Sequence, residues 1–533
     1  MDEIIRIQRL SYGSSGIGQS SQGKTVFVDN TVPGDLVRVR IDEKKASYDI
    51  GSMVEIVEAS DDRTVPSCPF YAKCGGCSWQ HITYKAQCAA KQQAIFDSLV
   101  RIGHFEVDFA ERIVRETLPS KKQFGYRNKL ELGTGYDRTN RLMLGFRESG
   151  KNNLASIDSC MLASPKIEKS PHALQGVLRY LQGSHDLKLF RVGVRHSVRT
   201  KDTEVALWTE PGSFPRKIVA QTIQSALTCS SVVRVISTPG KSRVVKQVES
   251  LNGKGCWEEQ LGDVHFKTSA PSFFQVNSTQ AHAMIEWVCA NLALPQHARV
   301  ADLYAGGGTF SIPLAFQCNE VIAVEAASSS VKDLRRNADL NGVDIEIIGG
   351  DSARELKKLG QLDALVVDPP RTGLAKGVIA DIAYCAPQKV AYISCNPSTW
   401  ARDMALFKEQ GYTLTQVQPF DLFPQTYHVE IVSILSKIEK SKYIPVSIEL
   451  GDNDLTKAES KATYEEIKQY VLDNNGFKVS QLYVTQIKRK HGLVERTNYN
   501  TGSGKSKVPK VPPEKEKAIE DALRYFKMIQ AND

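Results

Sequence analysis

The sequence predicts a multidomain protein whose largest part is an α/β domain with a Rossmann-like sheet. A small OB-like β-barrel and a central α+β domain precede it, and a helical extension follows. Two observations predict the α/β domain: apolar runs alternate with helical stretches after about residue 270, and turn residues follow the runs. A third observation, a change to Lys, Glu, Ser and Asn after about residue 440, marks the helical extension. The expected parts are 1–60, 61–269, 270–438 and 439–533.

Size and composition are typical of a soluble globular protein. Of the 533 residues, 41% are hydrophobic and 24% are charged, and the formal net charge is +8. No apolar run approaches the roughly 20 residues that span a bilayer, and the N-terminal MDEIIRIQRL lacks the hydrophobic region of a signal peptide. We therefore expect a cytoplasmic protein with no membrane partner and no obligate protein partner. The mild basic excess suits a polyanion if it is clustered.

Residues 1–60 contain short β-type runs that are separated by turn signals. The runs are IIRIQRL, KTVFV, DLVRVRID and SMVEIVEA, and the turns include SYGSSGIG and VPGD. Strands of this length and spacing predict a small OB-like barrel. Its lysines and arginines suit contacts with RNA phosphates, and an accessory barrel without a partner would show the same pattern.

Residues 66–81 hold three cysteines in one glycine-bearing turn. Cys68, Cys74 and Cys77 have the spacing C-x5-C-x2-C, which lets three thiolates converge on one centre. Zinc and iron–sulfur clusters both need a fourth ligand, and Cys160 is the candidate. Cys88 lies in a helical pattern and is expected to pack as a small apolar side chain. The spacing predicts a metal site and leaves zinc and a [4Fe–4S] cluster open.

From about 270 to 438 the pattern predicts a parallel, doubly wound sheet. The candidate strands are ARVADLY, EVIAVEA, IEIIGG, ALVVDPP, KVAYISC and HVEIVSIL. After the first strand, three consecutive glycines beginning at Gly306 open a helix, so that backbone can approach a ligand closely. Glu325 ends the second strand and is placed to accept hydrogen bonds from ribose hydroxyls. With Asp368 in DPPR after the fourth strand, these residues favour S-adenosylmethionine over NAD.

The stretch VAYISCNPSTW places Cys395 at the tip of a strand, because Asn396 and Pro397 end the apolar run. A carbon methyl acceptor such as uracil C5 is a weak nucleophile. A thiolate that adds to C6 makes an enolate whose C5 can attack a sulfonium methyl group. The C5 proton must then leave to a base, and Glu430 in YHVE is the candidate. Methylation of a base nitrogen is the rival reaction, in which Cys395 would be incidental.

The segment 439–533 predicts three helices: TYEEIKQYVLDNNG, VSQLYVTQIKRKHG and PPEKEKAIEDALRYFKMI. From residue 440 onward the chain has 17 Lys and Arg against 13 Asp and Glu. This basic excess favours an RNA-binding appendage, with an interaction module or a solvated tail as the alternatives, so its role stays open.

Taken together, the motifs over residues 1–438 resemble the RNA uracil-5 methyltransferases that carry a TRAM barrel and an iron–sulfur cluster. The motifs are the C-x5-C-x2-C turn with a distant cysteine, GYRNK, FFQVN, DLYAGGGTF, DPPR, SCNP and HVE. The resemblance implies a [4Fe–4S] cluster on Cys68, Cys74, Cys77 and Cys160. It also implies nucleophile Cys395, base Glu430 and methyl-donor contacts from Gln275, Tyr304, Gly306, Glu325 and Asp368.

The function expected from the residues and the resemblance is S-adenosylmethionine-dependent formation of 5-methyluridine in RNA. The barrel and the cluster resemble the branch of the family that acts on ribosomal RNA, so 23S rRNA is the expected substrate. A transfer RNA is the alternative substrate. A non-catalytic RNA-binding or assembly protein is the alternative class, which would have no need of Cys395, Glu430, Asp368 and Glu325 together.

Overall fold

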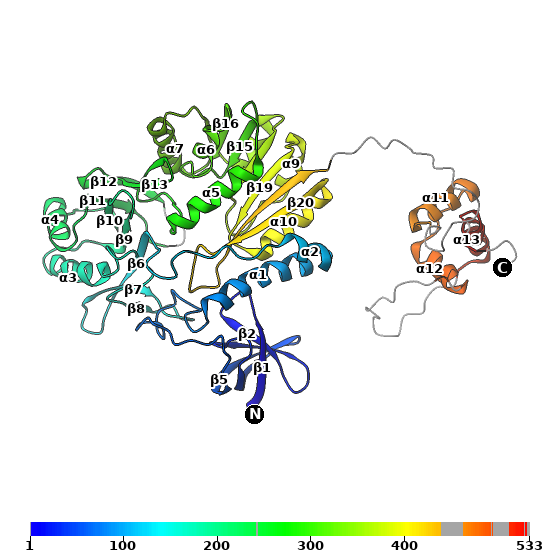
Figure 1. Ribbon diagram of the computed structural model, residues 1–533, viewed down its shortest axis with the longest axis horizontal. Coiled ribbons are helices and arrows are strands. Elements are labelled where there is room, and N and C mark those ends of the chain that lie inside the picture. Colours follow the sequence, from blue (N-terminus) through cyan, green and yellow to red (C-terminus); the bar gives the residue numbers. More distant parts are fainter. Residues whose placement is uncertain are drawn as a thin grey trace. The chain divides into compact units, whose positions relative to one another are not determined.

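The computed structural model describes residues 2–240, 244–438, 462–491, 493, 511–526 and 528–529 (Figure 1). The chain divides into two compact units, Met1–Glu439 and Lys440–Asp533, which are treated separately below. Among the described helices, none is both long enough and apolar enough to cross a membrane.

The first five strands form a closed barrel in the order β1-β2-β3-β5-β4. All neighbours are antiparallel except β3 and β5, and alternate residues such as Ile5, Val26 and Val37 fill the interior. The small barrel is confirmed, with β2 as an additional strand where the sequence pattern indicated a turn. The strands are β1 (Asp2–Leu10), β2 (Ser15–Gln19), β3 (Thr25–Asp29), β4 (Leu36–Lys44) and β5 (Tyr48–Glu58).

The central part contains a seven-stranded sheet in the order β12-β11-β10-β9-β6-β7-β8. Leucines of α3 (Ser170–Gln182) and Val219 and Ile223 of α4 (Arg216–Ala226) pack on one face of this sheet. The strands are β6 (Lys129–Tyr136), β7 (Leu142–Arg147), β8 (Leu154–Ser156), β9 (Leu189–His196), β10 (Thr203–Thr209), β11 (Ser231–Ser237) and β12 (Val245–Gly253). A separate hairpin follows, formed by β13 (Trp257–Leu261) and β14 (Val264–Thr268).

The third part is a seven-stranded sheet in the order β17-β16-β15-β18-β19-β21-β20. Its strands are β15 (Arg299–Leu303), β16 (Glu320–Glu325), β17 (Glu346–Gly349), β18 (Ala364–Val367), β19 (Lys389–Ser394), β20 (Tyr412–Phe420) and β21 (Glu430–Lys437). The first five are parallel, as predicted, but β21 is antiparallel to both β19 and β20. The prediction of a wholly parallel sheet was therefore wrong at this edge. The cause is β20, which no predicted strand covered and which reverses the chain before β21.

Helices cover both faces of this sheet (Figure 1). One face packs against α5 (Ser278–Leu292), α6 (Ser311–Ala315) and α7 (Ser328–Asn341). The remaining helical elements are α1 (Tyr84–Arg101), α2 (Val107–Ile113), α8 (Ser352–Glu355), η1 (Leu356–Leu359), α9 (Val378–Cys385) and α10 (Pro397–Glu409). The other face packs against α1, α9 and α10. Although α1 precedes the central sheet in sequence, its Ile95 and Leu99 thus belong to the core of the α/β sheet.

The second unit holds α11 (Tyr464–Asn475), α12 (Gln481–Lys490) and α13 (Pro513–Tyr525), the three helices that the pattern predicts. Thr463 and Glu466 form a capping box at the start of α11, and Gly476 ends the helix in a left-handed conformation. The helices share a core that includes Ile467, Val471 and Ile519. Much of the predicted linker before α13 lies outside the described residues.

Candidate active site

Cys395 and Glu430 lie at the same end of the α/β sheet. In the β19–β21 ladder the last pair is Ser394 with Ile431, so the next position on each strand is Cys395 and Glu430. Glu430 is 5% exposed, and the Cys395 side chain is half-buried. The predicted pair is thus brought together by the antiparallel return through β20. In a parallel sheet the start of β21 would lie at the opposite end from the tip of β19.

The surroundings of these two groups favour their protonated forms. Burial, together with the negative charge of Glu430, raises the pKa of the Cys395 thiol to about 11. Burial and the neighbouring Asp368 also raise the pKa of Glu430 well above its ordinary value. Both groups must lose a proton before they can act as nucleophile and base. A nearby cation would favour their deprotonated forms.

Arg371 is that cation. A hydrogen bond and the charge of its guanidinium lower the pKa of Cys395, and the same charge lowers the pKa of Glu430. The backbone at Arg371 is tied to the loop after Cys395: its carbonyl accepts hydrogen bonds from Asn396 Nδ2 at 3.1 Å and Thr399 Oγ1 at 3.2 Å. The DPPR motif contains this arginine, but the sequence pattern predicted a role only for its Asp368.

Tyr12 reaches the same loop from the barrel. Its hydroxyl donates a hydrogen bond to the backbone carbonyl of Cys395 at 2.8 Å, across 383 positions of sequence. Its ring packs edge-on against Tyr427, with the ring centroids 5.5 Å apart. Sequence reasoning missed Tyr12, because SYGSSGIG carries only a turn signal.

The segment before Glu430 is held from outside the α/β sheet. The backbone amides of Ser78 and Trp79, which directly follow the cysteine turn, donate to the carbonyl of Gln425 at 3.1 and 3.0 Å. On α1, Lys91 Nζ is fully buried and contacts Asp421 Oδ1 at 2.6 Å. The first half of the chain therefore fixes the approach to the predicted base.

The glycine loop follows β15 and is closed by Glu325 of β16. One Glu325 oxygen accepts from the backbone amide of Gly306 at 2.9 Å and the other from Ala327 at 2.6 Å. Gly306 has φ 58°, and a Cβ there would project into open space. Tyr304 also has a positive φ, 63°, which is costly for a non-glycine residue and marks a constrained loop. On the side where a Gly306 side chain would project, the loop is therefore unobstructed.

Two buried or half-buried carboxyl groups lie beside this loop. Burial raises the pKa of Asp302, in β15, and of Asp368, after β18, to about 7 each. Asp302 Oδ2 accepts from Ser311 Oγ at 2.5 Å. Among the described residues, its Oδ1 has no hydrogen-bond partner although it is buried. Asp302 belongs to DLYAGGGTF but was not among the predicted contacts; its position two residues before Tyr304 was the available signal.

Gln275 is placed by a different part of the chain. It is 6% exposed and lies just before α5, and its carbonyl accepts from Asn128 Nδ2 of the GYRNK motif at 2.8 Å. Asn128 Nδ2 also donates to Ser278 Oγ at 2.9 Å, at the first turn of α5. Two of the quoted motifs, GYRNK and FFQVN, therefore hold each other where the central part meets the α/β domain.

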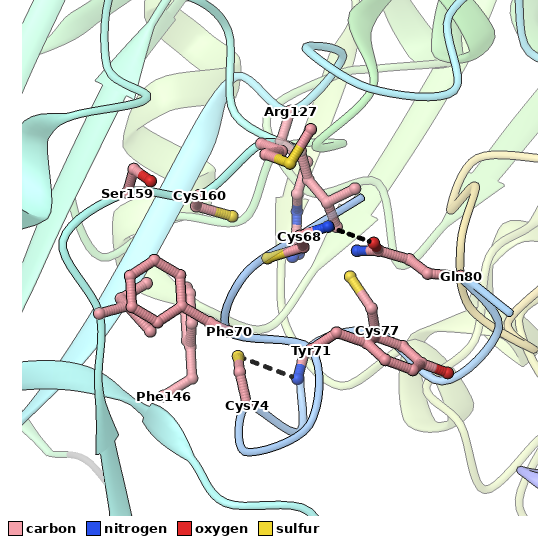
Figure 2. Close-up of a pocket in the computed structure, with 14 residues that line it drawn as sticks. Cys68, Phe70, Tyr71, Cys74, Cys77, Gln80, Arg127, Phe146, Ser159 and Cys160 are labelled. Atoms are coloured by element: carbon pink, nitrogen blue, oxygen red, sulfur yellow. Dashed lines mark hydrogen bonds between the residues drawn. The ribbon is translucent and has the colours of Figure 1, made fainter. Parts of the chain in front are cut away.

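The four predicted metal cysteines line one pocket. Figure 2 shows the sulfur atoms of Cys68, Cys74, Cys77 and Cys160 facing a shared space, with Arg127 beside them. Burial raises the pKa of Cys74, Cys77 and Cys160, that of Cys77 to about 12. Over the described ranges, however, no three His, Cys, Asp or Glu side chains come close enough to hold a single metal ion. The predicted cluster is therefore not shown.

Two parts of the chain match known families. Residues 4–54 match the TRAM domain, and residues 109–438 match the tRNA (uracil-5-)-methyltransferase family. The chain belongs to the tRNA (uracil-5-)-methyltransferase family. The enzyme class predicted from the sequence, a methyltransferase of the S-adenosylmethionine-dependent RNA uracil-5 type, is confirmed.

Members of this family and similar structures cover most of the first unit. An uncharacterised RNA methyltransferase of Thermosynechococcus vestitus is 34% identical over 444 residues, 81% of this chain and 97% of that protein. One from Halalkalibacterium halodurans is 30% identical over 446 residues, 81% of this chain and 96% of that protein. The crystal structure of the Pyrococcus abyssi tRNA (uracil-54, C5)-methyltransferase, in complex with S-adenosyl-L-homocysteine, is similar. Its TM-score is 0.64 at 26% identity, and the match covers 82% of this chain and 99% of that chain.

Proposed function

We propose that this enzyme methylates C5 of a specific uridine in RNA, with Cys395 as the nucleophile and Glu430 as the base. The observation that carries the proposal is the β19–β21 ladder, which brings a half-buried thiol and a buried carboxyl group to adjacent positions at one end of two neighbouring strands. A methyltransferase that acts on a base nitrogen has no chemical use for a cysteine at this place. A binding protein has no use for either group there.

The first step is the addition of the Cys395 thiolate to C6 of the uracil ring, which leaves an enolate with its electron pair available at C5. Because burial raises the pKa of the thiol, Arg371 is the residue that stabilises the thiolate at neutral pH. The target base must leave its stack to reach this half-buried thiol, so we expect the enzyme to flip the nucleotide or to act on a loop.

In the second step C5 attacks the methyl carbon of S-adenosylmethionine, and the carbon–sulfur bond breaks toward sulfur. The carboxyl groups of Asp302, Glu325 and Asp368 lie near one another at the glycine loop. Carboxylates of this kind attract the cationic donor more strongly than the neutral thioether product. We also propose the donor contacts that the resemblance implies, from Gln275, Tyr304, Gly306, Glu325 and Asp368.

In the third step Glu430 removes the C5 proton, and the electron pair re-forms the C5–C6 double bond as the Cys395–C6 bond breaks. The raised pKa of Glu430 makes its carboxylate a stronger base than an exposed one. The products are 5-methyluridine, S-adenosylhomocysteine and the free thiolate, while the proton stays on Glu430 until it is lost to solvent.

We propose further that Cys68, Cys74, Cys77 and Cys160 hold a [4Fe–4S] cluster. The four side chains line one pocket, yet among the described residues they do not converge as closely as Zn–S bonds of about 2.3 Å to a single ion require. In the described part of the chain Arg127 Nε is buried without a hydrogen-bond partner beside these thiols, and it suits an anionic group. When bound, the cluster would tie the cysteine turn to the segment after β8.

Among RNA targets, we propose 23S ribosomal RNA first and transfer RNA second. The ribosomal proposal rests on the sequence resemblance. The second is favoured by a specific observation: the similar Pyrococcus abyssi structure is a tRNA enzyme, and the match covers 82% of this chain.

Methyl transfer from tritiated S-adenosylmethionine to matched transcripts separates these targets. Labelling of a 23S fragment with no labelling of tRNA would support the first proposal, and the reverse would establish the second. Transfer of label to neither RNA, in protein with a full metal content, would count against both. Mapping of 5-methyluridine in cells without this protein would then identify the nucleotide.

A further inference from the structure

The β1–β2 loop of the barrel carries a side chain that enters the catalytic region from another domain. Tyr12 is half-buried, and its hydroxyl contacts the Cys395 carbonyl at 2.8 Å. Burial raises the pKa of Tyr12, and the nearby Cys395 and Glu430 raise it further. Neither the sequence motifs nor the proposed chemistry uses this tyrosine.

The carbonyl that Tyr12 contacts lies between two hydrogen-bonded elements. Strand pairing of β19 ends one residue earlier, at Ser394. Two residues after Ser394, Asn396 is the N-cap of α10, and its side chain accepts a hydrogen bond from the backbone amide of Ser398. Since Cys395 is the single residue between ladder and cap, its backbone orientation depends on what holds its carbonyl.

The loop that presents Tyr12 is itself well anchored. Ser11 binds the carbonyl of Ser15 through its amide at 2.9 Å and its hydroxyl at 2.8 Å, which closes the turn around Tyr12. Directly before the loop, Arg9 NH1 contacts Asp97 Oδ2 of α1 at 2.8 Å. Because α1 packs on the α/β sheet, the barrel is docked against the domain whose nucleophile it contacts.

We propose that Tyr12 is a positioning residue for the nucleophile, so that the barrel completes the active site. Resting on Cys395 as the nucleophile, this inference adds a role for the barrel beyond any contact with RNA. The Tyr12 hydroxyl fixes the Cys395 carbonyl and thereby the direction of the thiol, and the Tyr12 ring steadies Tyr427 three residues before Glu430. Small errors of position are costly in such sites because the attacking atom must stay aligned with its target.

The test is Tyr12→Phe, which removes the hydroxyl and keeps the ring contact with Tyr427. Tyr48→Phe is the matched control, since Tyr48 lies on the same barrel, is 36% exposed and, among the described ring contacts, packs edge-on against the barrel residue Phe27 alone. Two properties are measured in the full chain. One is the rate at which the covalent adduct forms, in a single turnover, with RNA that contains 5-fluorouridine. The other is hydrogen–deuterium exchange of residues 394–398, which needs no RNA.

For Tyr12→Phe we expect adduct formation to slow about tenfold and exchange at 394–398 to quicken, the size expected for one lost hydrogen bond. The affinity for RNA, the KM for methyl donor and the melting temperature should match those of Tyr48→Phe. Unchanged exchange and an unchanged adduct rate would overturn the inference. So would a parallel loss of RNA affinity and melting temperature, which indicates a purely structural role.

The two proposals fail in different ways. If wild-type protein forms no adduct, the proposed function fails, and the exchange measurement alone then decides whether Tyr12 holds the loop. If wild-type protein forms the adduct and Tyr12→Phe forms it equally fast, the reaction stands and the role of Tyr12 is refuted.

Discussion

Glu430 stands opposite Cys395 one position beyond the last pair of the β19–β21 ladder, Ser394 with Ile431. Because strand pairing sets this relationship, the proposed nucleophile and the proposed base are fixed relative to each other by backbone hydrogen bonds. With the backbone fixed, only the rotamers of the two side chains remain to be set. A site built on two rigid strands is suited to a reaction in which one group acts at C6 and the other at C5 of the same ring.

Replacing Glu430 by Gln should stop the reaction after methyl transfer, because an amide cannot accept the C5 proton. Turnover should fall about 10²- to 10⁴-fold, the usual contribution of a general base. Denaturing gels with unmodified uridine RNA should then show a methylated covalent complex that wild-type protein does not accumulate. A Glu430→Gln protein that turns over at the wild-type rate would remove Glu430 from the mechanism.

Replacing Arg371 by Gln should slow adduct formation by about tenfold or more, since a hydrogen bond to a charged group contributes about 1.5–3 kcal/mol. The loss should be the same at pH 7 and at pH 9, because both values lie below the pKa of Cys395, about 11, which rises further without the guanidinium. Lys376→Gln is the control, an exposed cation in the loop that follows the same motif. A loss in Arg371→Gln no larger than in Lys376→Gln would show that Arg371 does not act on the thiolate.

The single-turnover rate of wild-type protein should rise with pH from 6 to 9. The sign follows from two shifts in the same direction: the pKa of Cys395 is raised to about 11 and that of Glu430 is raised as well, and both groups act deprotonated. Raising the pH therefore increases the reactive fraction of each. A rate that falls over this range would contradict these protonation states.

Protein purified without oxygen should be brown and contain iron and acid-labile sulfide. Cys77→Ser should lose both, because an alcohol replaces a thiolate ligand, and reconstitution of wild-type protein should be faster at higher pH since the thiols must lose protons. Cys88→Ser is the control, because Cys88 lies on α1 and outside the pocket. Stoichiometric zinc without iron would contradict the cluster.

Lys91→Met should destabilise the first unit by about 3–5 kcal/mol, because it leaves Asp421 charged and buried without its partner. Both side chains are fully buried and 2.6 Å apart. Lys45→Gln removes the exposed pair with Glu43, which solvent screens, and should change the stability far less. Urea unfolding followed by circular dichroism measures the difference. Equal stability of the two variants would show that α1 is not held through this pair.

The local patterns predicted most of the elements and the sites built within one motif. Gly306, Glu325 and Cys395 all lie at strand ends, where a β-branched run followed by turn residues locates them in sequence. The cysteine turn was equally visible, and the structure gathers its three thiols with Cys160 in one pocket.

Relations between distant segments could not be predicted in this way. The antiparallel edge depends on β20, whose sequence YTLTQVQPF begins with alternating apolar and polar residues, unlike the apolar runs that located the other strands. That pattern can indicate a strand but does not give its neighbours in the sheet. The assignment of α1 to the α/β core and the contact of Tyr12 with Cys395 depend on how the barrel and the cysteine turn pack. No local periodicity encodes such tertiary contacts.

The most direct measurement is mass spectrometry of the adduct formed with 5-fluorouridine RNA and S-adenosylmethionine. Fluorine at C5 leaves no proton for Glu430 to remove, so the reaction halts with RNA bound to the enzyme. We predict one methylated nucleotide attached to Cys395 and none in Cys395→Ala. Cys229→Ala is the matched control, because burial raises the pKa of its thiol to about 11 as well. An adduct that survives Cys395→Ala, or attachment at another cysteine, would contradict the mechanism.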